Sequence, residues 1–122
     1  MKTLVIDGNN FSNYEELCKE FNKTVFVGCY NQWTTGNLDG FNDLLREVDC
    51  TIIWKNFAQS KKNLSYSETV KYLKEILEHC HPSNRINVSQ KIQRAESGAG
   101  PTILDWVLEI IAEHDNVILK LE

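Results

Sequence analysis

Two groups of regularly spaced carboxylates are the strongest candidates for functional residues in the sequence. Asp39 and Asp43 are four residues apart, and Asp105, Glu109 and Glu113 repeat that interval. In a helix, side chains four residues apart project side by side, so each group would form an acidic stripe. Two acidic stripes in one small domain could clamp a basic surface, or they could be solvated helix faces without a partner. The spacing alone leaves both interpretations open.

The sequence contains little that indicates an enzyme. The sequence has no Gly-x-Ser-x-Gly motif, and Gly36-x-x-x-Gly40 lacks the Lys-Ser/Thr of a phosphate-binding loop. Asp39 and Asp43 would lie on a convex helix, without the pocket that an acid–base pair requires. We therefore predict a protein that is not an enzyme and that needs no cofactor.

A metal site is also not expected. The segment His79-Cys80-His81 holds three possible ligands, but neighbouring side chains on a helix point about 100° apart and cannot chelate one ion. A helix C-terminus, where the dipole favours histidines, explains this segment better. The sequence has no Cys-x-x-Cys and no recognisable export signal, so we expect reduced, mostly buried cysteines at the following positions: Cys18, Cys29, Cys50 and Cys80.

Composition and charge indicate one small acidic domain. The 122 residues are 42% hydrophobic and carry a net charge of −4, and no apolar run reaches the roughly 18 residues of a membrane span. Residues 61–101 hold seven basic and four acidic side chains, so the rest of the chain is strongly acidic. We expect a cytoplasmic protein that is not membrane-bound, has a basic partner and does not bind nucleic acid directly. An acidic surface that only maintains solubility is the alternative.

Three apolar runs predict strands, at residues 3–6, 51–54 and 117–121. The run at 50–54 shows no alternation, as expected for a central strand covered on both faces. Helical patterns separate these runs. Strands that alternate with helices pair in parallel through right-handed crossovers, so we predict a small α/β domain with a three-stranded parallel sheet.

Apolar residues at intervals of three and four predict the helices. Their expected starts and caps are as follows: near residue 14, capped by Ser12 or Asn13; near residue 38, capped by Asn37; residues 57–64; residues 66–80, capped by Ser67; and after Thr102, which forms a capping box with Asp105. Residues 24–30 could form a strand or a loop packed on the core. The polar stretch 81–101 is predicted to be a partly flexible surface excursion, anchored by Ile86, Val88 and Ile92.

Three motifs occur in the order found in a known protein family. Residues 5–8 are Val-Ile-Asp-Gly, residues 36–45 are Gly-Asn-Leu-Asp-Gly-Phe-Asn-Asp-Leu-Leu, and residues 53–64 begin Ile-Trp-Lys-Asn-Phe. They resemble, respectively, the opening strand and turn, the inhibitory helix G-x-N-L-D-x-φ-x-D-x-L, and the W-x-x-F-x-x-S-K-x-L segment of the barstar family. That family comprises small α/β inhibitors of barnase-like ribonucleases. Residues 102–121 are similar to its C-terminal helix and strand.

The resemblance implies a function as well as a fold. The fold would be barstar-like over residues 1–122, with an insertion at about 65–101 that adds a helix and a loop. The chain would be a bacterial immunity protein that is monomeric when free and binds a basic ribonuclease toxin one-to-one. Its acidic helix would plug the active site of the nuclease by mimicking a phosphate. The alternative is the same fold used as a scaffold or regulatory module with a non-nuclease partner.

The resemblance also implies which residues contact the partner: Trp33, Asn37, Asp39, Asn42, Asp43, Arg46, Glu109 and Glu113. Asp43 matches the carboxylate that takes the place of the substrate phosphate, and Asp39 matches its supporting carboxylate. Trp33 falls where the family has an aromatic that stacks on the nuclease. Asn42 and Arg46 depart from the family, which often has an aromatic and a neutral residue at those positions. With the basic insertion, these departures predict a different target nuclease.

Overall fold

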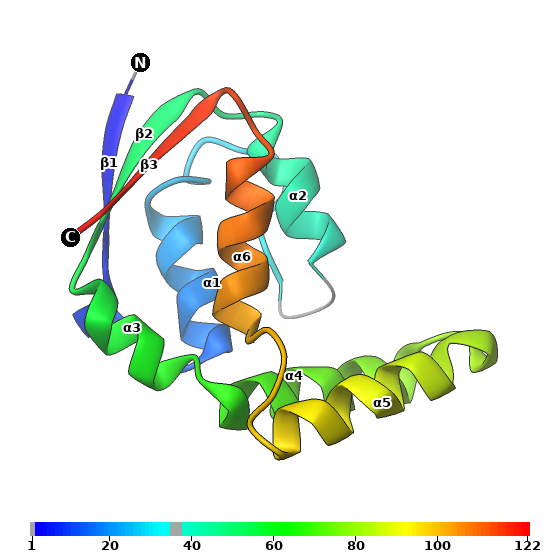
Figure 1. Ribbon diagram of the computed structural model, residues 1–122. Coiled ribbons are helices and arrows are strands. Elements are labelled where there is room, and N and C mark those ends of the chain that lie inside the picture. The colour runs from blue at the N-terminus through cyan, green and yellow to red at the C-terminus, as the bar shows by residue number, and fades with distance from the viewer. Residues whose placement is uncertain (1, 35–37) are drawn as a thin grey trace.

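The computed structural model describes residues 2–34 and 38–122. These residues form an α/β fold with three strands and six α-helices, shown in Figure 1. Their bounds in chain order are β1 Lys2–Asp7, α1 Tyr14–Lys23, α2 Asp39–Leu45, β2 Cys50–Lys55, α3 Phe57–Asn63, α4 Tyr66–His79, α5 Arg85–Glu96, α6 Ile103–Ala112 and β3 Val117–Leu121. Short 3₁₀ turns at Gly8–Asn10 and Pro82–Asn84 precede α1 and α5.

The three predicted strands are confirmed, and they pair in parallel. The sheet order is β1-β2-β3. Leu4 lies opposite Ile52, which in turn lies opposite Leu119. Each connection between strands passes through helices, as parallel pairing requires.

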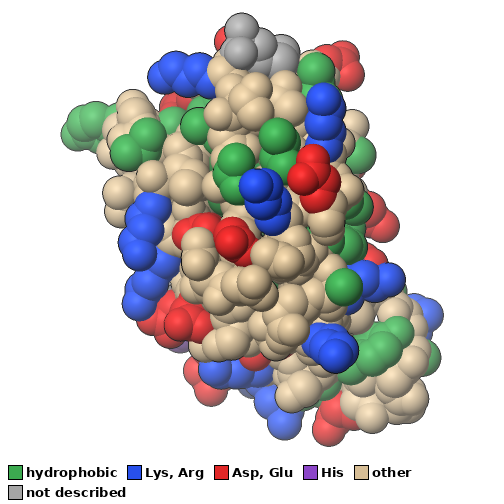
Figure 2. Space-filling view, turned by 90° about the vertical axis from the view of Figure 1, so that its left-hand side faces the viewer, with side chains coloured by type: hydrophobic (Ala, Val, Ile, Leu, Met, Phe, Trp, Pro, Cys, Tyr) green, Lys and Arg blue, Asp and Glu red, His purple; other side chains and the backbone are tan. Residues whose placement is uncertain are grey.

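The sheet is covered on one face only, so the prediction that β2 is covered on both faces is wrong. Ile52 and Trp54 are fully buried, whereas Ile53 between them is half-buried. Val5 and Ile118 lie on the same open face, 42% and 46% exposed. The sequence hid this alternation because the outward residue Ile53 is itself apolar. Figure 2 shows the open side, where hydrophobic side chains lie among charged ones.

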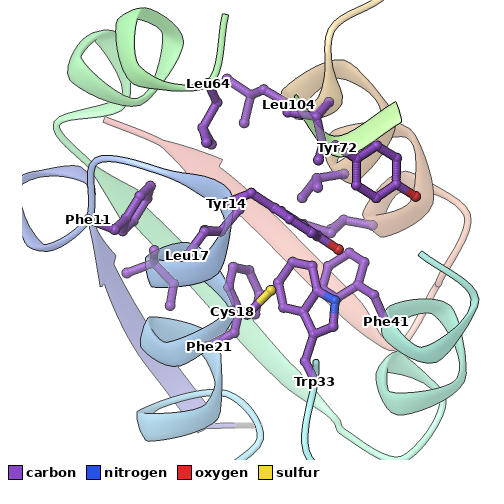
Figure 3. Close-up of a cluster of buried hydrophobic side chains, with 14 of the residues drawn as sticks. Phe11, Tyr14, Leu17, Cys18, Phe21, Trp33, Phe41, Leu64, Tyr72 and Leu104 are labelled. Carbon is purple, nitrogen blue, oxygen red and sulfur yellow. The ribbon is translucent and has the colours of Figure 1, made fainter. Parts of the chain in front are cut away.

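Helices α1, α2 and α6 enclose an aromatic core on the covered side of the sheet. The Trp33 ring stacks on Phe41 of α2, with centroids 4.2 Å apart. Phe21 of α1 meets both rings edge-on, at 5.3 and 5.4 Å. Figure 3 shows Trp33 and Phe41 side by side within this cluster. These contacts fix the orientation of α2 relative to α1.

Two of the motifs noted in the sequence contact one another. The indole Nε1 of Trp54 donates a hydrogen bond to Ser60 Oγ at 2.9 Å, and Ser60 is fully buried. A Cβ on Gly8 would lie 2.4 Å from the Asn56 carbonyl oxygen and 2.6 Å from Ser60 Oγ. The turn after β1 can therefore approach the start of α3 only with glycine at position 8.

The segment 81–101 lies at the surface as predicted, but the loop expected there is wrong. Residues 85–96 form α5, which returns along α4 as a helical hairpin that projects from the body (Figure 1). Val88, Ile92 and Ala95 are buried at helical spacing, whereas the expected anchor Ile86 is 75% exposed. A few small apolar residues are enough to hold α5 because α4 provides the surface that they cover.

The hairpin is tied to the body by hydrogen bonds at the base of α4. The fully buried Thr69 Oγ1 donates to the Ser65 carbonyl at 2.9 Å and accepts from the Ile103 N–H of α6 at 2.8 Å. The Tyr66 hydroxyl donates to the Gly100 carbonyl at 2.8 Å. The N-cap of α4 is Ser65 and not the predicted Ser67, because the Ser65 carbonyl already accepts from the Thr69 N–H.

Other predictions about the ends of the helices hold. Asn13, one of the two candidates, caps α1 by accepting from the Glu16 N–H at 2.8 Å. Thr102 and Asp105 form the predicted capping box at the start of α6. Residues 24–30 form turns with Val25 and Phe26 buried, so the packed loop is the correct alternative of the two.

The cysteines, all within the described part of the chain, are free. Cys18 and Cys50 are buried, while Cys29 and Cys80 are half-buried against the core. Burial raises the pKa of the Cys18 thiol to about 12, so it remains protonated and unreactive at neutral pH. Among the residues described, no helix has both the length and the apolar character needed to cross a membrane.

Candidate functional site

Helix α2 positions the two aspartates. Its inner side buries Phe41, Leu44 and Leu45, which leaves Asp39 and Asp43 exposed as predicted. Asp39 is in the first turn, where the helix dipole stabilises a negative charge. Exposed carboxylates held on a packed helix can accept charge-assisted hydrogen bonds from arginine or lysine side chains of a partner.

Arg46 lies beside the second aspartate. Its Nη1 is 3.6 Å from Asp43 Oδ1, and the two side chains are 68% and 71% exposed. Pairs this exposed contribute little to stability because water screens them and side-chain entropy opposes them. A partner cation can therefore displace Arg46 from Asp43 at small cost.

Asn42 connects α2 to the end of α6. Its Oδ1 lies 2.7 Å from His114 Nε2, and an amide oxygen can only accept, so the imidazole donates. Close by, Asn116 Nδ2 donates to the Leu45 carbonyl at 2.7 Å and also to the Val48 carbonyl. These bonds hold the middle and the C-terminal end of α2 against the segment that joins α6 to β3. Asn42 is therefore a positioning residue as well as a candidate contact.

The second acidic stripe lies on the neighbouring helix. Asp105, Glu109 and Glu113 are exposed along α6, opposite its buried residues Ile103, Val107 and Ile111. Leu104 is also buried on this helix, whereas Ile110 is half-buried. Helices α2 and α6 contact each other directly (Figure 1). The structure thus brings both stripes onto adjacent elements.

A groove lies between α6 and the residue before α2. Leu38, the residue before Asp39, lines this groove together with Glu109 and Glu113. The start of α2 and the acidic side of α6 therefore face a common depression. We call the surface formed by Asp39, Asp43, Glu109 and Glu113 the acidic face.

Trp33 is not part of the acidic face, and its burial does not present it for the predicted stacking on a partner. Its side chain is 2% exposed and lies among Phe21, Phe26 and Phe41. Its backbone N–H and C=O are both held by the side chain of Asn22, at 2.8 and 2.9 Å. The aromatic cluster offers this indole more apolar surface than the exterior does.

Neither of the two roles predicted for Asn37 can be placed in the described part of the chain. Asn37 was expected both to cap α2 and to contact the partner, but it lies outside the described residues. The N-cap of α2 is Leu38, which makes no side-chain capping bond.

The sequence analysis missed two aromatics that are exposed or half-exposed. Tyr30 is 98% exposed in the loop before Trp33. Trp106 is half-buried on α6, one turn before Glu109. A tryptophan inside an acidic helical stripe was a usable signal, because tryptophan is enriched where proteins bind one another.

Within the described ranges 2–34 and 38–122, no three His, Cys, Asp or Glu side chains are placed so that they could hold a metal ion. Comparisons of the chain with protein-family models, with curated proteins and with solved structures found no match. We therefore infer the function from the acidic face and its geometry.

Proposed function

We propose that this chain is an immunity protein with a barstar-like fold that inhibits a ribonuclease toxin. The observation that carries the proposal is the arrangement of the acidic face. Asp39 and Asp43 project from α2, and Glu109 and Glu113 project from the helix packed beside it. A cationic RNA-binding site is the complementary surface for such a group of carboxylates.

The proposed mechanism is competition for the cationic centre of the nuclease. The Asp43 carboxylate takes the place of a substrate phosphate among arginine, lysine or histidine side chains, and Asp39 pairs with a further cation. No bond is made or broken, and substrate is excluded sterically. The bonds from Asn42 to His114 and from Asn116 to Leu45 hold α2 in place before binding. Little conformational entropy is then lost on association.

The proposed partner is a basic protein bound one-to-one, and charge governs how they meet. Opposite potentials on the two surfaces accelerate encounter and reject acidic competitors. Glu109 and Glu113 lie on the neighbouring α6, where they would contribute more to the association rate than to the lifetime of the complex.

The test asks whether the product of the neighbouring gene is a ribonuclease that this chain inhibits. The two chains are co-expressed, the stoichiometry of the complex is measured by light scattering, and ribonuclease activity is titrated with wild type and Asp43→Ala. We expect Asp43→Ala to raise the inhibition constant by about 30-fold or more, because a central charge pair is lost. Glu15→Ala, which removes an exposed carboxylate on α1, is the matched control. A tight complex indifferent to Asp43→Ala would contradict the proposal.

A scaffold or regulatory module with a non-nuclease partner is the second candidate. It is favoured by the internal partners on α2, since Asp43 already faces Arg46 and Asn42 already bonds to His114. The same experiment separates the two candidates. A stable complex in which ribonuclease activity is unchanged would support the module and exclude the inhibitor.

A further inference from the structure

A groove lies where the α4–α5 hairpin meets the body of the fold. It has a volume of about 300 Å³, and its walls come from α4, α5, α6 and the residue before α2. Its apolar lining includes Tyr72 and Ile76 of α4, Val88 of α5, and Trp106 and Ile110 of α6. No single element could form this groove, and the hairpin supplies one complete side of it.

The rim of the groove is acidic. Glu109 and Glu113 line it, and Lys91 is the cation on the opposite side, with its Nζ 5.9 Å from the centre of the Trp106 ring. Asp39 directly follows Leu38 of the lining and is not itself a lining residue. Two carboxylates therefore line the apolar floor, with one ammonium group across from them.

The groove is continuous with the acidic face. Glu109 and Glu113 belong to both, and Leu38 of the groove directly precedes Asp39. A partner that lies on α2 and α6 would have to pass over this opening. An apolar pocket with a charged rim is the anatomy of a binding hot spot, in which one inserted side chain contributes much of the affinity.

We propose that the groove receives an aromatic or large aliphatic side chain of the basic protein partner, flanked in the partner by arginine or lysine. This inference rests on the proposed function, because the occupant belongs to the protein bound by the acidic face. The carboxylates of the rim pair with the flanking cations, and the apolar floor takes the anchor. The α4–α5 hairpin thereby adds a second contact to the one made by α2.

The dimensions and the charge select this occupant. A volume of about 300 Å³ is at the lower limit of small-molecule sites and suits one large side chain. The acidic rim disfavours an anionic ligand and an acidic peptide, and it complements a cation on either side of the anchor.

The first test uses short peptides and does not need the nuclease. The ¹⁵N-labelled full chain is titrated with the acetylated and amidated tripeptide Arg-Phe-Arg, and backbone amide shifts are followed by NMR. The control peptides are Arg-Ser-Arg, which lacks the anchor, and Glu-Phe-Glu, which reverses the charge. We expect saturable shifts around Ile76, Val88 and Trp106 with Arg-Phe-Arg. Arg-Ser-Arg should bind about tenfold more weakly, since burial of the phenyl ring is lost.

Each outcome decides the matter. Equal binding of Arg-Phe-Arg and Arg-Ser-Arg would show attraction of charge alone and overturn the proposal. Equal binding of Glu-Phe-Glu, or the absence of saturable shifts at the groove, would overturn it as well.

The second test uses the nuclease complex and separates this inference from the proposed function. Ile76→Arg places a cation in the groove, whereas Ile86→Arg places one on α5 at a residue that is 75% exposed and outside the groove. We expect Ile76→Arg to weaken inhibition about tenfold or more and Ile86→Arg to leave it within about twofold. Circular dichroism and urea unfolding check that both variants fold. If Asp43→Ala abolishes inhibition but Ile76→Arg does not, the groove proposal fails while the proposed function stands.

Discussion

The guanidinium of Arg46 lies 3.6 Å from the carboxylate of Asp43, so α2 carries a cation beside the carboxylate that is proposed to meet the cations of a partner. The positive charge of Arg46 lowers the net negative charge around Asp43, the proposed central contact of the acidic face. It also means that binding must exchange one charge pair for another. Arg46 is therefore expected to reduce affinity for a basic protein and to favour partners that can displace it.

Replacing Arg46 should tighten the complex with a basic partner. We expect Arg46→Ala to increase affinity by about two- to fivefold, since an exposed pair is broken and a repulsive charge is removed. Isothermal titration calorimetry at low and high salt measures the change, and the gain should shrink at high salt. Lys19→Ala is the matched control, because Lys19 makes a similarly exposed pair with Glu15 on α1. Weaker binding by Arg46→Ala would mean that Arg46 itself contacts the partner.

Trp33 should affect stability rather than recognition. Trp33→Ala removes a stacked indole from the core and is expected to lower the free energy of unfolding by about 3–5 kcal/mol. Urea denaturation followed by circular dichroism measures the loss. Tyr30→Ala, at an aromatic residue that is 98% exposed in the same loop, should change stability little. Unchanged stability with impaired binding would show instead that Trp33 leaves the core to contact the partner.

Thr69 should couple the hairpin to the rest of the fold. Thr69→Val keeps the shape of the side chain but leaves the N–H of Ile103 without its acceptor. We expect a loss of about 1–3 kcal/mol in the free energy of unfolding, in a single transition. The exposed Ser67→Ala on the same turn is the control. An unaltered transition midpoint would mean that the hairpin is not joined to the body through Thr69.

Acid should weaken the fold through Asp7. Hydrogen bonds from Asn56 Nδ2 at 2.8 Å and from the backbone N–H of Asn9 at 2.9 Å hold the pKa of the Asp7 carboxyl below its usual value. The contribution of Asp7 to stability is therefore complete above the unfolded pKa of about 3.9 and is lost as the pH falls through the lower folded value. In urea titrations at falling pH, Asp7→Asn should show a smaller loss than wild type. Glu15→Gln should follow wild type, and a loss in Asp7→Asn as large as that of wild type would contradict the assignment.

Local sequence patterns were enough to predict several of the elements and their caps. The three strands, the cap at Asn13 and the capping box of Thr102 and Asp105 all follow from local patterns. The outward side chains of Asp39 and Asp43 could also be predicted, because the opposite side of their helix is apolar.

The rest depends on contacts between distant segments. Helix α5 has few apolar residues, and Val88 and Ile92 stabilise it only when they are buried against α4. Trp33 is buried because Phe21 and Phe41 meet it, and neither neighbour is adjacent in sequence. The open face of the sheet was missed because its outward residue Ile53 is apolar. An apolar residue at that position fits a strand covered on both faces as well as one covered on a single face. The groove could not be predicted at all, since it joins three helices and the residue before α2.

The parallel sheet has a consequence for how fast this chain folds. Strand β2 is central, and its partner β3 follows only after α3, α4, α5 and α6. Pairing Cys50 with Val117 therefore closes a long loop. The chain between them must lose conformational entropy before the contacts of the paired strands stabilise the fold. Helix α6 reaches its place beside α2 through the same closure. The rate at which the acidic face forms is thus set by the slowest and most distant pairing in the molecule, not by the helices that carry its carboxylates.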